Sequence, residues 1–480
     1  MWLDKFQRFF LEYKVCLLFA LLYLWGIFFW EDRVFIVASS EKIVSYICVK
    51  VISYCTLAGL FIFFYRGIKK DGCERKMIKA SALYVVILTV LFFMRHDMVL
   101  VGDELNIYNE AIRYNIYPYH FTYFTGLYYC VSLTLFPFMM GPMVLKIILQ
   151  SIVVGYCCYK LKSKWLVYIM FLTPVTISEA LMLHRMQIYA LLYLVFVIKV
   201  FYDSKENIID KSRQFCIMSA ICAVLSIWRS EGIALMFTGL PLLFLVYKYR
   251  IQNLKVILWV YVLIVSAILL PHVMYSNQGI SSPYAKIATS YAAWTTHLPR
   301  YGLDYDKYPM QKDKIEAVIS IDAVNKINID LGDNNFDDVY IAFKPQYIGI
   351  KHATPEEWKE YMEAMNYIIL HEPEIFLKTR IAAWVYTANN GVALNVNSKN
   401  PVTRILFSLL IPLFGILAGL AYSILKKRWA IVILNITLLL HFVLTAMFSP
   451  AAYFKYYYHL YLIGYLQIFI LVTYRRLLFG

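Results

Sequence analysis

Apolar runs of 15 to 24 residues recur along almost the whole chain, and short polar segments separate them. Runs of this length match the roughly 20 residues that an α-helix needs to cross the hydrocarbon core of a bilayer. The pattern therefore predicts an all-α polytopic membrane protein with about 12 transmembrane helices. The predicted spans cover residues 15–30, 44–65, 80–97, 142–160, 165–180, 187–202, 214–228, 233–248, 254–271, 402–425, 429–447 and 456–474.

The short loops between these runs predict the orientation of the chain. The N-terminal "DKFQRFFLEYK" is basic, so we expect it on the cytoplasmic side. Alternation of the spans then places both termini in the cytoplasm, together with six basic segments. These segments are 66–79, 159–164, 203–213, 247–255, 426–428 and 474–476. The one Asn-x-Ser/Thr site, at Asn435, falls inside a span where it cannot be glycosylated, which favours a bacterial inner membrane.

The segment 122–140, "TYFTGLYYCVSLTLFPFMM", is apolar enough to be a further span. Counting it as one would move every later basic loop to the other side of the membrane. We therefore expect an amphipathic or re-entrant helix at the outer interface, within an outer loop of residues 98–141. A crossing of the membrane by this segment remains the alternative.

The polar segment 272–401 predicts an extracytoplasmic loop domain between two membrane domains, 1–271 and 402–480. In "HATPEEWKEYMEAM", Thr354 is placed as an N-cap and Glu357 completes a capping box. Pro373 is expected to start a second helix that lies along the membrane. The Asp-rich stretch "DLGDNNFDDVY" is interpreted as a solvated turn, with a divalent-ion site as the minority alternative.

The composition agrees with a membrane protein and argues against a soluble or a nucleic-acid-binding protein. The chain is 61% hydrophobic and only 16% charged, whereas soluble proteins carry roughly 25% charge. A net charge of +15 would suggest nucleic acid in a soluble protein. Because Lys and Arg cluster in the loops that orient the chain, we expect membrane lipids as partners and no nucleic acid. The nine Cys form no CxxC pair or disulfide framework.

The candidate chemistry begins directly after the third span, with Asp103 and Glu104. Glu110, seven residues after Asp103, shares its helical face. Carboxylates at a span end are often only solvated, but desolvation beside apolar segments would raise the pKa of a carboxylate toward that of a useful base.

Cations gather on the same predicted side of the membrane. Arg185, Arg229 and Lys455 lie opposite to where positive charge is normally placed, which indicates a compensating role. Such cations can hold a lipid phosphate and stabilise its charge as it leaves, while a carboxylate takes the proton of an incoming hydroxyl. The other candidates for substrate binding on this side are His120, His184, Glu231, Arg380, Tyr456 and His459.

The segment "GDELNIYNEAIRYNIYPYHF" resembles the first outer loop of the GT-C superfamily, integral-membrane glycosyltransferases that use polyprenyl-phosphate sugars. Protein O-mannosyltransferases and lipid A aminoarabinose transferases belong to it. Asp103, Glu104, Tyr108 and Ala111 stand where that family has its Asp-Glu pair, aromatic residue and helix. The segments 141–162 and 450–462 are similar to its next span and its late loop, with Lys455 in place of Arg. The large loop departs from the family, whose soluble domain is C-terminal.

The resemblance implies a GT-C-like fold with juxtamembrane helices and an inverting glycosyltransferase. Such an enzyme would move a sugar from a polyprenyl-phosphate carrier to a glycan, lipid or protein acceptor, in cell-surface glycan synthesis. It implies that Asp103 acts as the base, and that Glu104 assists or binds a divalent cation in members that use one; no other cofactor is implied. Candidates for the lipid phosphate are then Arg185, Arg229, Arg380 and Lys455, with Tyr456 to Tyr458 stacking on sugar or packing against isoprenoid.

Two alternatives stay open. An O-antigen polymerase or ligase would not depend on Asp103 and would depend strongly on Arg in the large loop. A transporter or flippase for lipid-linked sugar would show internal repeats and ionisable residues at mid-membrane depth. We find no clear repeat, and we interpret the main polar residues within spans, Asn435 and His441, as partners in helix–helix hydrogen bonds.

Overall fold

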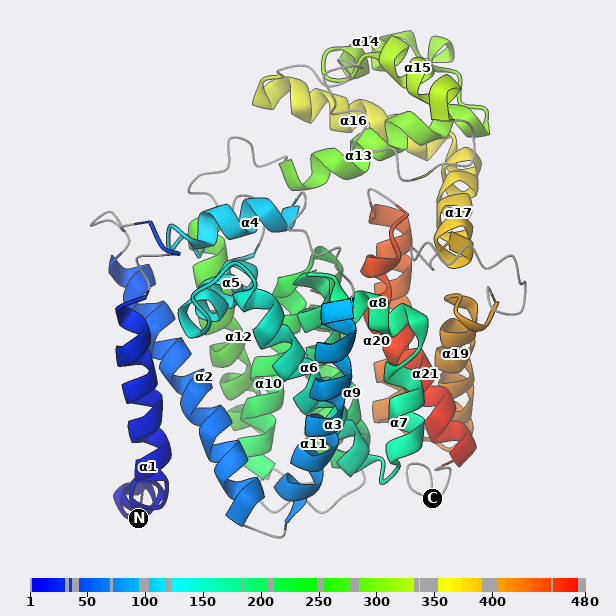
Figure 1. The fold of residues 1–480 in the computed structure, drawn as a ribbon. Helices are drawn as coiled ribbons and strands as arrows, with labels where there is room; N and C mark the ends of the chain where they lie inside the picture. Colours follow the sequence, from blue (N-terminus) through cyan, green and yellow to red (C-terminus); the bar gives the residue numbers. More distant parts are fainter. Residues whose placement is uncertain are drawn as a thin grey trace. The chain divides into compact units, whose positions relative to one another are not determined.

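Helices make up every regular element in the residues that the computed structural model describes, and these residues contain no strand (Figure 1). The all-α prediction is therefore confirmed for this part of the chain. The described residues are 2–30, 34–36, 43–69, 72–94, 103–116, 122–183, 185–204, 211–247, 254–276, 285–331, 336, 353–390, 405–449 and 452–473.

Within the described residues, six helices are long and apolar enough to cross a membrane, which supports a helical membrane protein. They are α1 (Trp2–Phe28), α2 (Ile43–Lys69), α3 (Cys73–Met94), α6 (Gly141–Lys160), α9 (Arg185–Asp203) and α20 (Trp429–Phe448). Five helices with shorter apolar stretches coincide with further predicted spans. They are α10 (Lys211–Trp228), α11 (Ile233–Tyr247), α12 (Leu254–Ser276), α19 (Leu410–Leu425) and α21 (Tyr458–Thr473). The total of about 12 spans stays a prediction.

The predicted span 165–180 is not one continuous helix. It consists of α7 (Lys164–Phe171) and α8 (Pro174–Leu181), which are bent by 66° relative to each other. Thr173 caps α8 by accepting a hydrogen bond from the backbone N–H of Thr176, and Pro174 follows at the first helical position. Because proline has no N–H and its ring clashes with the preceding turn, α7 cannot continue through this point.

The segment predicted to lie at the interface forms α5 (Tyr123–Leu135), which packs against α2, α4 (Asp103–Ala111) and α6. Ten of its 13 residues are buried. A helix of this length spans about 20 Å, less than the roughly 30 Å of the hydrocarbon core. It is therefore too short to cross the hydrocarbon core by itself, and the expected position at the outer interface, as an amphipathic or re-entrant helix, stays a prediction. Figure 1 shows α4 lying across the direction of α2.

The chain divides into two compact units. The first unit is Met1–Ser230 with Val246–His272, and the second is Glu231–Leu245 with Val273–Gly480. The predicted loop domain and the last three predicted spans thus belong to the same unit. The three-domain boundaries inferred from the sequence stay predictions.

Close helix packing in the first unit depends on small residues. A Cβ at Gly155 of α6 would lie 2.2 Å from Ser81 Oγ and 2.5 Å from the carbonyl oxygen of Met77, both on α3. The hydroxyl of Tyr84 on α3 donates to the carbonyl of Phe171 on α7 at 3.0 Å. Gly155 thus allows a close approach of α6 to α3, as small residues do in membrane helix pairs, and the Tyr84 hydrogen bond joins α3 to α7.

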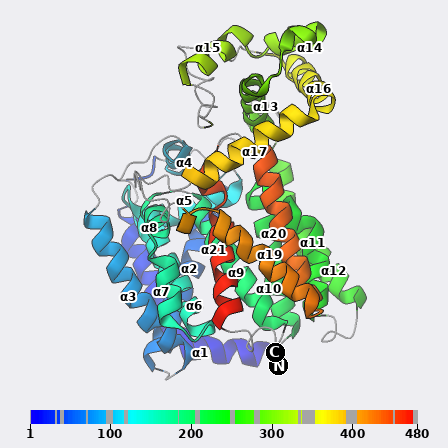
Figure 2. The same ribbon diagram turned by 90° about the vertical axis from the view of Figure 1, so that its right-hand side faces the viewer.

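In the second unit, the helices of the predicted large loop have a hydrophobic core of their own. They are α13 (Ala285–His297), α14 (Pro309–Glu316), α15 (Ile321–Leu331), α16 (Pro355–His371) and α17 (Pro373–Asn390), seen from another side in Figure 2. Trp294, Tyr361, Met365 and Ile368 belong to this core. The predicted capping box is confirmed, since Glu357 N–H donates to Thr354 Oγ1 at 3.2 Å and Thr354 N–H donates to Glu357 Oε2 at 2.7 Å. The predicted helix start at Pro373 is also confirmed, whereas the expected placement of this helix along the membrane stays a prediction.

Buried polar side chains join α20 and α21. Gln467 of α21 donates to Asn435 of α20 at 2.7 Å, which confirms the helix–helix hydrogen bond expected for Asn435. His441 lies beside His459, with ring centroids 4.4 Å apart.

Candidate functional site

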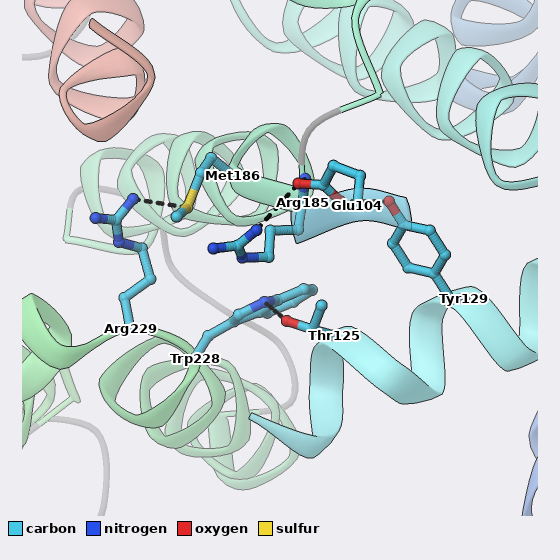
Figure 3. A network of polar contacts seen from close by, with 7 residues as sticks. All are labelled: Glu104, Thr125, Tyr129, Arg185, Met186, Trp228 and Arg229. Atoms are coloured by element: carbon cyan, nitrogen blue, oxygen red, sulfur yellow. Dashed lines mark hydrogen bonds and ion pairs between the residues drawn. The ribbon is translucent and has the colours of Figure 1, made fainter. Parts of the chain in front are cut away.

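Glu104 is the centre of a buried polar network in the first unit (Figure 3). It lies in the first turn of α4 and is 5% exposed. Its Oε1 accepts from the backbone N–H of Arg185 at 3.3 Å and from Arg185 Nη1 at 3.1 Å. Its Oε2 accepts from the hydroxyl of Tyr129 on α5. Donors from two other helices thus engage both oxygens of this carboxylate.

The phase of α4 explains why Glu104 points inward. Glu104, Ile107 and Ala111 are all buried, at the i, i+3 and i+7 spacing of one helical face. A carboxylate on a buried face needs hydrogen-bond donors, because an unpaired buried charge is expensive. Arg185 and Tyr129 meet that requirement.

Tyr129 acts as a donor in this network. Burial, and then the neighbouring Glu104 carboxylate, raise the pKa of the Tyr129 phenol well above its ordinary value. The phenol therefore stays protonated, and its O–H group donates a charge-assisted hydrogen bond to Glu104 Oε2.

A second contact from α5 connects the network to the end of α10. Thr125 lies one turn before Tyr129 on α5, so the two side chains share a helical face. The indole Nε1 of Trp228 donates to Thr125 Oγ1 at 3.2 Å. The Trp228 ring also packs against Phe124, with centroids 5.7 Å apart.

Arg229 completes the connection back to α9. It is 8% exposed, and its Nη1 contacts the sulfur of Met186 at 2.7 Å. Its guanidinium also lies 5.8 Å from the ring centroid of Tyr189. These contacts, the adjacent pairs Arg185–Met186 and Trp228–Arg229, and the shared face of Thr125 and Tyr129 on α5 connect seven residues in a closed loop (Figure 3), which we call the Glu104 ring. Its members are Glu104, Arg185, Met186, Arg229, Trp228, Thr125 and Tyr129.

The Glu104 ring contains two guanidinium groups and one carboxylate. The side chain of Arg185 is 12% exposed, and α9 begins at the same residue. The partial positive charge of a helix N-terminus therefore adds to the two arginines. This combination is suited to an anionic group such as a phosphate.

A second buried cluster, which was not predicted from the sequence, lies beside the turn between α8 and α9. The amine of Lys146 on α6 donates to Gln187 Oε1 at 2.5 Å, to the carbonyl of Glu179 at 3.4 Å and to the carbonyl of Met182. Gln187 in turn donates to Glu179 Oε2 at 3.1 Å. Lys146 was counted only as part of an apolar span. Its charge within that span was the available signal.

Three of the predicted site residues have side chains outside the described residues. Asp103 begins α4, but its side chain is not described, and His120 and His184 are not described at all. Glu110 accepts a hydrogen bond from Asn115 Nδ2 at 2.6 Å, near the C-terminal end of α4. Glu110 therefore lies about 9 Å along the helix from Glu104, and none of its described contacts joins the Glu104 ring.

Arg380, in the second unit, has a structural role. Its Nε and Nη2 donate to the carbonyl of Ala446 at 2.9 and 2.7 Å, and Nη2 also donates to the carbonyl of Ser449 at 2.9 Å. Both carbonyls lie at the C-terminal end of α20, where a cation is favourable. The guanidinium thus caps α20, and these contacts do not support the predicted role of Arg380 in binding a lipid phosphate.

The remaining candidates also belong to the second unit. Lys455 lies over the rings of Tyr453 and Tyr456, 4.9 and 5.6 Å from their centroids. Tyr456 and His459 are buried, and Glu231 is buried in the short helix η3 (Ser230–Gly232). Because they belong to a different compact unit from the Glu104 ring, a single pocket that contains all the candidates stays a prediction.

A resident metal ion also stays a prediction. Within the described residues, no group of three His, Cys, Asp or Glu side chains is arranged to hold one. Most of the Asp-rich stretch 330–340 lies outside those residues.

Comparisons of this chain with protein-family models, with characterised proteins and with solved structures found no match.

Proposed function

We propose that this protein is a membrane glycosyltransferase that moves a sugar from a polyprenyl-phosphate carrier to an acceptor hydroxyl at the extracytoplasmic face. The observation that supports it most is the Glu104 ring, which joins a buried carboxylate to Arg185 and Arg229 where α9 begins. The ring offers positive charge for a phosphate directly beside an acidic pair.

In this proposal the two neighbouring carboxylates have different tasks. Three donors already engage Glu104, and they stabilise its ionised form. We therefore assign Glu104 as a positioning residue that orients Arg185 and fixes the start of α4. Asp103, the preceding residue, is assigned as the general base, as the resemblance to the GT-C superfamily also implies.

The proposed reaction is a direct displacement at the anomeric carbon. The acceptor hydroxyl attacks that carbon, its proton passes to Asp103, and a new glycosidic bond forms. The bond between the anomeric carbon and the phosphate oxygen breaks, and the electron pair leaves with the polyprenyl phosphate. Arg185 and Arg229 would stabilise the negative charge that develops on this oxygen.

The described contacts bear on the polymerase or ligase alternative. The loop 272–401 contains two arginines, Arg300 and Arg380. Arg300 donates to Asn328 Oδ1 at 2.7 Å, and Arg380 caps α20. The contacts of Arg300 and Arg380 join elements of their own unit, whereas those of Arg185 place it beside an acidic pair, so we favour the glycosyltransferase.

A transporter of lipid-linked sugar is the second candidate, because Lys146 and Glu179 are ionisable residues buried in predicted spans. Lys146 lies five residues after the start of α6, which is about 8 Å from that end of the helix. This depth is about halfway between the end of α6 and its middle, so Lys146 does not lie at the mid-membrane depth expected of a transport site.

The test uses the full chain, purified and reconstituted in nanodiscs of phosphatidylethanolamine and phosphatidylglycerol. The discs are offered undecaprenyl-phosphoryl mannose, glucose, galactose and aminoarabinose, and release of undecaprenyl phosphate is followed by mass spectrometry. We expect release from at least one donor by the wild type. Asp103→Asn should lower the rate by about 100-fold or more, the usual size of a general-base contribution.

Asn106→Ala, on the exposed face of α4, is the matched control and should keep full activity. Undiminished release by a folded Asp103→Asn variant would refute the proposed base. No release from any donor, together with passage of an intact donor across proteoliposomes, would favour the transporter.

A further inference from the structure

Helix α17 changes character at Arg380. Its first half carries Glu374, Lys378 and Arg380, whereas residues 381–388, "IAAWVYTA", contain no charge. The helix is continuous through this point. One end of α17 is therefore suited to water and the other to an apolar environment.

Two contacts define how α17 lies on α20. The guanidinium of Arg380 binds the carbonyl of Ala446, and the ring of Trp384 packs on Phe442 with centroids 5.6 Å apart. Trp384 is four residues after Arg380, and Phe442 is four residues before Ala446. The two helices are therefore antiparallel, and the second half of α17 runs from the C-terminal end of α20 back along its side.

The length of α20 indicates where α17 lies relative to the hydrocarbon core. α20 has 20 residues and is a candidate membrane span, and its length of about 30 Å matches the hydrocarbon core. Arg380 binds at the end of that span. The uncharged residues 381–388 of α17 continue from this boundary toward the part of α20 that lies at hydrocarbon depth.

The two faces of this half-helix differ. Ala383, Thr387 and Ala388 are buried in the second unit, at 5%, 1% and 2% exposure. On the other face, Ile381 is 56% and Val385 is 42% exposed. These two residues form an apolar stripe at helical spacing.

The stripe continues onto the exposed face of the neighbouring span. Val385 follows Trp384, and Val443, which is 46% exposed on α20, follows Phe442. The Trp384–Phe442 contact thus joins the exposed apolar faces of α17 and α20. In a spanning helix such a face contacts lipid, so the same lipid reaches Ile381 and Val385.

We propose that the second half of α17 is inserted into one leaflet of the bilayer, where Ile381 and Val385 contact lipid acyl chains. By the predicted orientation this is the extracytoplasmic leaflet. α17 enters the membrane beside α20 without crossing it, and Arg380 marks the boundary with water. The helices of the large loop are thereby anchored to the bilayer by a segment that is not a span. This proposal does not depend on the proposed reaction.

The test places the photo-crosslinking residue p-benzoylphenylalanine at single positions of the full chain in phosphatidylcholine nanodiscs. Positions 381 and 385 test the stripe. Phe414 of α19, 69% exposed in an apolar helix, is the positive reference, and Leu370 of α16, 78% exposed, is the matched control on the loop helices. After irradiation, mass spectrometry measures phosphatidylcholine adducts.

We expect adducts at 381 and 385 in yields comparable to position 414, and none at 370. Adducts at position 414 alone would overturn the proposal, and so would crosslinks from 381 to a second protein chain. As a further check, Ile381→Lys should lower the adduct yield at position 385 by about fivefold, because a lysine is expelled toward the interface. Leu370→Lys should leave that yield unchanged, and an equal loss from both substitutions would contradict insertion.

Discussion

Arg185 donates twice to the same oxygen of Glu104, from its backbone N–H at 3.3 Å and from its guanidinium at 3.1 Å. The carboxylate of α4 thereby satisfies the first N–H of α9 and pairs with the first side chain of that helix. Residues 81 positions apart in the chain are held together by this contact. It fixes the position of a guanidinium group that the proposed reaction uses.

Removal of the Glu104 charge should be strongly destabilising. Glu104→Gln leaves the Arg185 guanidinium, whose side chain is only 12% exposed, without its carboxylate, and breaking a buried ion pair typically costs about 3–5 kcal/mol. We expect this loss in an unfolding titration with dodecyl sulfate in dodecylmaltoside micelles. Glu74→Gln is the matched control, because Glu74 pairs with Arg66 at 2.7 Å but the Arg66 side chain is 43% exposed. The control substitution should lower the free energy of unfolding by about 1 kcal/mol or less. Equal losses of stability in the two variants would contradict a buried ion pair at Glu104.

Tyr129→Phe should impair the proposed transfer more than Tyr128→Phe. The two residues are adjacent on α5, and both are buried. Tyr129 donates to Glu104, whereas Tyr128 donates to the carbonyl of Pro142 at 2.5 Å. Loss of a hydrogen bond to a charged group costs about 1.5–3 kcal/mol. The rate of undecaprenyl phosphate release and the unfolding midpoint are measured for both variants. A larger effect of Tyr128→Phe on that rate would count against the role of the Glu104 ring.

Lys146→Met should loosen the turn that carries Arg185. The amine of Lys146 holds the C-terminal end of α8 and Gln187 of α9. A methionine fills similar space but donates nothing, so several buried acceptors lose their partner. Hydrogen–deuterium exchange should rise in residues 182–187. Lys160→Met, at the other end of α6, should leave exchange in these residues unchanged, and a similar rise there would remove the special role of Lys146.

Arg380→Lys should weaken the cap of α20 although the charge is kept. Two nitrogens of the guanidinium fork reach the carbonyl of Ala446, and one of them also reaches Ser449. A lysine amine cannot reproduce that geometry. The expected loss is about 1–2 kcal/mol in the same unfolding titration. Lys378→Ala, which removes a side chain that is 59% exposed, should change the midpoint by less than the Arg380 variant.

Acid should destabilise the loop helices partly through Glu357. Hydrogen bonds from Thr354 lower the pKa of Glu357 below its ordinary value. Because the pKa is lower in the folded state than in the unfolded state, this contribution is present above the unfolded pKa and is lost as the pH falls through the folded one. The melting temperature of the wild type should therefore fall more steeply than that of Glu357→Gln between roughly pH 5 and pH 3. Parallel curves for the two proteins would show that the capping box carries no such linkage.

The sequence alone was sufficient for the features that depend on neighbouring residues. The apolar runs predicted the helices, and the capping box at Thr354 and the helix start at Pro373 were found where they were expected. The reason is that helix starts and caps depend on hydrogen bonds within a single turn. Pro174 was a local signal of the same kind, and the break between α7 and α8 could have been predicted from it.

Only the tertiary structure decided which charged groups meet. Asp103 and Glu104 are equivalent in the sequence, but successive helical residues point about 100° apart, so the docking of α4 selects Glu104 for Arg185. Arg185 and Arg380 were both phosphate candidates, and only the packing shows that Arg380 caps α20. Lys146 was hidden in an apolar run. Contacts between residues far apart in the chain depend on how the helices pack, and helical periodicity does not specify that packing.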